Sequence, residues 1–220
     1  QANPVQPDAW LRQIRARDLA AEAQYYAGDR NGAVAGYRLA LAQAEAGAAR
    51  FPDQPALQWA VQRQQWNLGS SLAAVNKPME ALPLLKKSLD GWSAMAKADP
   101  EDESLRRWIS TTRLSYAEAL RIAGRTDAAI TEHGIELAAS RTALLEAPDA
   151  IELQRSLVVR LNALADSLGE TGRRREACAL LGVILAVGVG AGALMLRQSE
   201  PAAVAQKDPN WWEPGSAPDS

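Results

Sequence analysis

The stretch AGDRNGAVAGY at residues 27–37 has three counterparts further along the chain, VNKPMEALPLL at 75–85, AGRTDAAITEH at 123–133 and TGRRREACALL at 171–181. The four begin at residues 27, 75, 123 and 171, so the spacing is 48 residues each time. A small residue and a large apolar residue keep this spacing, at Ala33, Ala81, Ala129 and Ala177 and at Leu41, Leu89, Leu137 and Leu185. Recurrence at one fixed period indicates a repeat architecture, in which every repeat is one supersecondary unit.

Each repeat has the composition of a helical hairpin. Ala, Leu, Glu, Gln and Arg dominate and β-branched runs are scarce, which favours helix over strand. A residue that tolerates left-handed backbone, and can therefore end a helix, stands in the middle of each unit: Gly28, Asn76, Gly124 and Gly172. A Pro followed by an acidic residue separates the units, at Pro52, Pro100 and Pro148. Because one hairpin cannot bury its own apolar stripe, we expect about four of them to stack around a continuous core.

The domain organisation follows from the period. We expect an N-terminal linker at 1–8, a helical repeat array at 9–176, an apolar last helix at 177–196 and a disordered tail at 197–220. The units would cover about residues 9–52, 53–100, 101–148 and 149–196. The chain starts without a Met or a signal-peptide pattern, and we interpret it as a fragment or a processed product.

The second unit resembles the tetratricopeptide repeat (TPR) family, whose pattern is W-x2-L-G-x2-Y followed by A-x3-F. Leu68 and Gly69 fit the L-G pair, Leu72 takes the place of the Tyr, and Ala81 and Leu85 take those of the Ala and the Phe. The resemblance implies an all-α fold, a right-handed superhelical stack of antiparallel helical hairpins. The family's usual period is about 34 residues, so a longer unit implies longer helices. With its longer helices, the array resembles the TPR arrays that are attached to bacterial eukaryotic-type Ser/Thr kinases.

Composition excludes several classes of function. Lys plus Arg (24) nearly balance Asp plus Glu (26), so the net charge indicates no nucleic-acid partner. Cys178 is the only cysteine and His133 the only histidine, which excludes an internal disulfide and any metal site built on several of these residues. No nucleophile motif accompanies His133. We therefore expect no catalytic residue, no metal and no cofactor, and a protein that is not an enzyme.

The resemblance also implies a binding face. In the family, the first helices of successive hairpins line a concave groove that holds a peptide or protein segment. Carried over at spacings of three and four residues, this gives Arg15, Asp18, Glu22 and Tyr25 in the first unit, Arg63, Trp66, Asn67 and Ser70 in the second, Thr111, Leu114, Glu118 and Arg121 in the third, and Asn162 and Asp166 in the fourth.

Two qualifications apply to this groove. Trp66 could anchor a partner, but a large aromatic at helical spacing more often packs between hairpins. Chaperone-binding members of the family grip a terminal carboxylate with Lys, Asn and Arg. Only Asn67 occupies a matching place here, so that ligand is not expected.

The segment 177–196 carries no charged side chain and is flanked by Arg173–Arg175 and Arg197. Its twenty residues suffice to span a bilayer, and Gly188 and Gly192 would let two such helices approach closely. The arginines would keep the array at the cytoplasmic face of that membrane. The alternatives are an apolar surface for a partner or a second copy, or a sequence junction.

The sequence thus predicts a cytoplasmic protein-binding scaffold, with the segment 177–196 as a candidate membrane anchor. The alternative is the regulatory or sensor portion of a larger signalling enzyme such as a bacterial Ser/Thr kinase. Its catalytic domain would lie outside this chain, because the kinase signatures are absent from these residues.

Overall fold

The computed structural model describes residues 6–147 and 150–179. Within these residues it contains helices and turns but no strand. The helices are α1 (Pro7–Tyr26), α2 (Arg30–Arg50), α3 (Pro55–Ala74), α4 (Pro78–Ala98), α5 (Glu103–Ile122), α6 (Thr126–Glu146) and α7 (Ile151–Glu170). Residues 174–179 are also helical.

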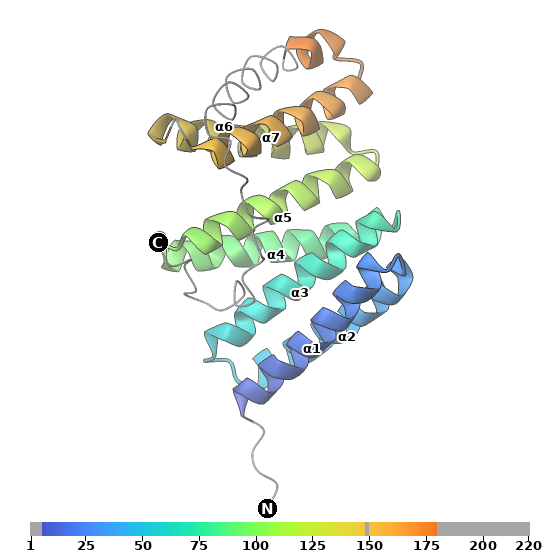
Figure 1. Ribbon diagram of the computed structural model, residues 1–220, viewed down its shortest axis with the longest axis vertical. Coiled ribbons are helices and arrows are strands. Elements are labelled where there is room, and N and C mark those ends of the chain that lie inside the picture. Colours follow the sequence, from blue (N-terminus) through green and yellow to red (C-terminus); the bar gives the residue numbers. More distant parts are fainter. Residues whose placement is uncertain (1–5, 148–149, 180–220) are drawn as a thin grey trace, which may run out of the picture.

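The helices pair into hairpins that stack one on another. Figure 1 shows α1 and α2 at one end of the stack, α3 to α5 in the middle and α6 beside α7 towards the other end. The first helices of the hairpins, α1, α3, α5 and α7, begin at residues 7, 55, 103 and 151, which are 48 residues apart. The predicted all-α stack of helical hairpins is therefore confirmed. The first helix starts at Pro7, so the last two residues of the predicted linker are helical.

One residue in left-handed backbone conformation lies at the turn of each hairpin, as the sequence predicts. Positive φ angles occur at Gly28 (89°), Asn76 (59°), Gly124 (73°) and Gly172 (77°). Only glycine, and less readily asparagine, adopts this conformation without a steric penalty, so the first helix must end there. The chain then reverses within three residues and the second helix packs back on the first.

Small residues let the two helices of a hairpin approach closely. Ala33, Ala81 and Ala129 are each 0% exposed. In the second hairpin, a Cβ added at Gly69 would lie 2.7 Å from Cγ of Leu85. At the repeated alanine position, the space between the two helices therefore admits little more than a methyl group.

Four tryptophans pack together where the second hairpin meets the third. Trp92 is stacked on Trp108 with ring centroids 5.3 Å apart, and Trp59 meets Trp92 edge to face at 4.5 Å. Trp66 meets Trp108 edge to face at 5.2 Å. These rings contribute both buried area and favourable geometry to the junction of α3, α4 and α5.

A buried polar network joins α5, α6 and α7. Glu136 accepts hydrogen bonds from Nε of Arg113 at 3.0 Å and from the hydroxyl of Ser110 at 2.6 Å. Nη2 of Arg160 donates to Ser110 at 2.6 Å, and its Nε lies 3.5 Å from Glu136. A buried carboxylate held between two guanidiniums fixes how these helices sit against each other.

The predicted apolar segment 177–196 lies outside the described residues apart from its first three. Ala177 is buried and belongs to a cluster with Leu164 and Leu168 of α7. Among the helices described, none has the length and apolarity to cross a membrane. The predicted tail at 197–220 also lies outside the described part of the chain.

Candidate functional site: a pocket between the first two hairpins

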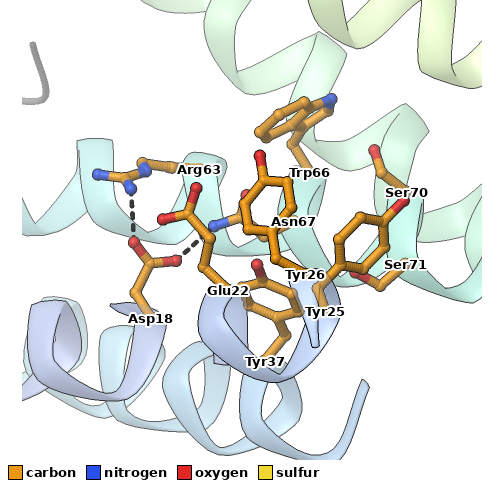
Figure 2. Close-up of a pocket in the computed structure, with 10 residues that line it drawn as sticks. All are labelled: Asp18, Glu22, Tyr25, Tyr26, Tyr37, Arg63, Trp66, Asn67, Ser70 and Ser71. Carbon is orange, nitrogen blue, oxygen red and sulfur yellow. Dashed lines mark hydrogen bonds and ion pairs between the residues drawn. The ribbon is translucent and has the colours of Figure 1, made fainter. Parts of the chain in front are cut away.

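A pocket of about 250 Å³ opens between the C-terminal halves of α1 and α3. Tyr37 enters it from α2. Figure 2 shows the side chains that line it: Asp18, Glu22, Tyr25, Tyr26, Tyr37, Arg63, Trp66, Asn67, Ser70 and Ser71. The lining is thus rich in aromatic rings and polar groups, whereas the core cluster beside it consists mostly of Ala, Leu and Val and shares Tyr37 with the pocket.

A buried ion pair closes one side of the pocket. Nη2 of Arg63 lies 2.5 Å from Oδ2 of Asp18, and the side chains are 9% and 3% exposed. The other carboxylate oxygen, Oδ1, accepts a hydrogen bond of 2.7 Å from Nδ2 of Asn67. Both oxygens of Asp18 therefore bind groups on α3, and α1 is joined to α3 at this point (Figure 2).

Burial governs the protonation of this pair. It raises the pKa of Asp18 above its ordinary value, while the neighbouring Arg63 and Gln64 act in the opposite direction. It also lowers the pKa of Arg63, against the attraction of Asp18. Desolvation is the larger effect on both groups because both side chains are almost fully buried.

Aromatic rings form the rest of the wall. Tyr25 and Tyr26 meet edge to face with centroids 5.8 Å apart, and Tyr26 is 72% exposed. The guanidinium carbon of Arg30 lies 3.8 Å from the centroid of the Tyr25 ring. Tyr37 is buried, and its pKa is raised by burial and then by the charges of Asp18 and Glu22.

A smaller recess lies on the other side of Arg63. It measures about 40 Å³ and shares Asp18 and Arg63 with the pocket. Arg15 and Trp59 also line it, together with apolar residues of α1 and α3. The pocket is therefore the larger of the two spaces and has more room for a side chain.

Seven of the predicted partner-binding residues come together in the pocket. They are Asp18, Glu22, Tyr25, Arg63, Trp66, Asn67 and Ser70. Arg15 lines the smaller recess. Glu118, Arg121 and Asp166 line a separate open depression of about 800 Å³ between α5 and α7. Thr111, Leu114 and Asn162 lie outside these three cavities.

In the depression between α5 and α7, two of the predicted residues, Glu118 and Arg121, bind one another. Arg121 is 2.7 Å from the carboxylate of Glu118 and 2.5 Å from that of Glu170. The hydrogen bonds that Arg121 donates to these carboxylates raise its pKa. Its guanidinium therefore bridges two helices of the stack.

Trp66 has two roles in the structure. Its ring lies in the tryptophan cluster, as expected for packing between hairpins, and its Nε1 donates to the hydroxyl of Ser115 on α5 at 2.9 Å. It also lines the pocket.

His133 is buried on α6, and burial lowers its pKa.

Sequence reasoning missed three residues of the pocket, Tyr26, Tyr37 and Ser71. Tyr37 belongs to the second helix of its hairpin, whereas the prediction took groove residues only from the first helices. Tyr26 ends α1, and Ser71 directly follows the predicted Ser70. The one available signal was the clustering of Tyr25, Tyr26 and Tyr37 in a chain that has only 4 tyrosines.

Comparison with known proteins adds little to this description. No family model and no curated protein matches the chain. A solved structure of MamA from MSR-1 is 18% identical, covering 81% of this chain and 98% of that chain, with a TM-score of 0.39. MamA from AMB-1 is 20% identical over 86% of this chain and 98% of that chain, with a TM-score of 0.40. At these TM-scores, neither similarity carries an argument about function.

Proposed function

We propose that this protein is a scaffold that binds a peptide or protein segment along the face formed by its first helices. The observation that carries the proposal is the pocket between α1 and α3, which is open to solvent and lined by aromatic and polar side chains. Apolar contacts supply most of the packing between hairpins, so the stack itself does not require an open cavity lined by polar groups.

The exposed Tyr26 supports this assignment. A tyrosine that is 72% exposed contributes little to the core, yet it stands at the pocket next to Tyr25. Tyrosine and tryptophan are the residues that contribute most binding energy at protein interfaces, because they bury a large rigid surface and keep a polar group.

The ion pair supports it in a different way. Asp18, Arg63 and Asn67 fix the spacing of α1 and α3, so the pocket is already formed in the free protein. A preformed pocket loses less conformational entropy on binding than a flexible one.

Site-specific photo-crosslinking tests the proposal. A benzoylphenylalanine placed at Tyr26 is expected to capture one protein segment from a cell extract of the source organism. The matched control places the same group at Leu39, which is 58% exposed on α2 and outside the pocket. The proposal fails if both positions capture the same dispersed set of proteins, because surface stickiness would then explain the result.

A further inference from the structure

We infer that, in the free protein, the pocket between α1 and α3 holds a tryptophan of the chain's own C-terminal segment, one of the pair Trp211 and Trp212. A partner segment can enter only after this tryptophan leaves, so the contact regulates the site. The inference rests on the proposed function, because it names what competes with the partner at that same pocket. It takes 177–196 as a segment that does not cross a membrane, so that the tail and the pocket lie on the same side.

The charged groups around the pocket balance one another, which favours a neutral occupant. The carboxylates of Asp18 and Glu22 and the guanidinium of Arg63 line the pocket. Arg15 supplies a second guanidinium from the recess on the other side of Arg63, and it acts electrostatically on both Asp18 and Arg63. Arg15 and Glu22 also have interactions of their own. The site therefore has no excess charge that would select an acidic or a basic side chain over an aromatic one.

The rings of the lining suit an indole. Tyr25, Tyr26, Tyr37 and Trp66 gather around the pocket (Figure 2). Aromatic rings attract one another edge to face or offset, and tryptophan brings a large ring surface to such a contact. The protein uses this packing beside the pocket, where Trp66 meets Trp108 edge to face at 5.2 Å. Tyr26, which is 72% exposed, has most of its surface available for a further contact of this kind.

The hydroxyl groups of the wall suit the indole nitrogen. An indole N–H donates one hydrogen bond and accepts none, and it usually finds a partner when it is buried. The pocket offers tyrosine and serine hydroxyls as acceptors. The Ser70 hydroxyl is covered and has no hydrogen-bond partner among residues 6–147 and 150–179, so it can turn towards a donor without losing a bond. An indole in the pocket would thus satisfy both groups.

The volume of the pocket limits the occupant to one large side chain. At about 250 Å³, the pocket is smaller than the roughly 300–1,000 Å³ typical of small-molecule sites. Adjacent side chains of an extended segment point to opposite sides, so only one of Trp211 and Trp212 can enter. Pro209 and Pro214 flank the pair, and proline restricts the backbone before it to extended conformations. This restriction lowers the entropy that the segment loses when it docks.

The chain between the array and the tryptophan pair is long enough to reach the pocket. Residues 180–210 span up to roughly 100 Å when extended, and residues 197–210 alone reach roughly 45 Å. The pocket at α3 lies two hairpins away from α7, which is roughly 20–30 Å for packed helices. A tethered segment has an effective concentration on the order of 1 mM, so a contact with a Kd of about 0.1 mM would be about 90% formed.

Photo-crosslinking within the purified full chain tests the contact. A benzoylphenylalanine placed at Tyr26 is irradiated without any extract, and the linked peptides are identified by mass spectrometry. We expect residue 26 to be linked to the segment 209–214 of the same chain. The yield should be about tenfold above that of the matched probe at Leu39, which is 58% exposed and outside the pocket.

Variants of the tail locate the contact. Trp211→Ala combined with Trp212→Ala should remove the link, whereas Val204→Ala, which changes an apolar residue of the same tail, should keep it. Equal yields at residues 26 and 39, or a link that survives the loss of both tryptophans, would overturn the inference. A linked product of twice the chain mass would also overturn it, since the tail would then reach a second copy.

Capture from a cell extract separates this inference from the proposed function. Removing both tryptophans should raise the yield of the segment captured at residue 26 about tenfold, because the pocket is then free in every molecule. An unchanged yield would overturn regulation by the tail and leave the scaffold function standing. Capture of no segment by either protein would overturn the scaffold function, whereas the link between residue 26 and the tail is measured without any partner.

Discussion

The Asp18 carboxylate and the Arg63 guanidinium, which come from α1 and α3, meet at 2.5 Å with side chains only 3% and 9% exposed. A charged side chain buried away from water is stable only while it pairs with an opposite charge, because water cannot solvate it there. The junction of the first two hairpins therefore depends on both residues together, and the pocket beside them depends on that junction.

Removing one member of the pair should destabilise the protein strongly. Asp18→Ala is expected to lower the free energy of unfolding by roughly 3–5 kcal/mol, since it leaves the charge of Arg63 buried without its counter-ion. The double change Asp18→Leu with Arg63→Met should recover most of the loss. Urea denaturation followed by circular dichroism measures both. Asp90→Ala is the control, because the Lys86–Asp90 pair is 53% and 61% exposed and should contribute less than about 1 kcal/mol. Similar losses for Asp18→Ala and Asp90→Ala would contradict the burial argument.

His133 should make the stability depend on pH. Burial lowers its pKa in the folded protein below the ordinary 6.5. Below that pH the unfolded chain therefore binds more protons than the folded one, so stability is fully present above about 6.5 and declines as the pH falls. Leu85 occupies the same place in the second hairpin, which makes His133→Leu a compatible substitution. Melting temperatures measured between pH 8 and pH 5 should fall less for His133→Leu than for the wild type.

Other charges around His133 act in both directions. Glu118 favours the protonated ring and Arg121 disfavours it, both from α5, while Glu136 and Glu132 of α6 favour it. Burial is the largest influence, so the folded pKa still lies below the unfolded one. Identical pH profiles for the two proteins would show that the acidic neighbours cancel the effect of burial.

Two glycines should respond to alanine in opposite directions. Gly124 has φ of +73°, where a side chain is strained, so Gly124→Ala should cost roughly 1–2 kcal/mol. Gly134 lies within α6 with open space around it, so Gly134→Ala should stabilise the protein by about 0.5–1 kcal/mol. Thermal unfolding of the two variants gives the comparison, and a shift of the same sign in both would be inconsistent with the turn geometry.

The close approach at Gly69 should make it intolerant of a methyl group. An added Cβ would meet Leu85 at 2.7 Å, so Gly69→Ala should cost roughly 1–3 kcal/mol through overpacking. Gly169→Ala on α7 has no neighbour within 4 Å and is the control. A double-mutant cycle with Leu85→Ala should show that the cost falls once the leucine is shortened. An unchanged cost would place the strain elsewhere.

The helices could be predicted from the sequence because their ends are set locally. A glycine or asparagine with positive φ turns each hairpin, and these residues recur visibly along the chain. Alternating small and large apolar positions then indicate which faces pack. The packing of Trp66 between hairpins followed from the same reasoning, and the structure shows it in the tryptophan cluster.

The pocket could be predicted only in part, because it depends on how neighbouring helices are spaced. Asp18 and Asn67 were both assigned to the binding face, but their hydrogen bond is a contact between α1 and α3 that the sequence does not encode locally. Tyr37 reaches the pocket from α2, past the close contact of Gly36 with Ala21. Such a position follows from side-chain length and helix separation, neither of which a repeat pattern reports.

The order of the helix contacts has a mechanical consequence. The extensive contacts among the described helices join helices that are one or two places apart in the chain, and none closes the stack into a ring. A small rotation at one junction is therefore not opposed by a distant one, and rotations at successive junctions add up along the stack. We therefore expect the stack to bend elastically, so that its curvature could adjust to a long binding partner while each hairpin stays rigid.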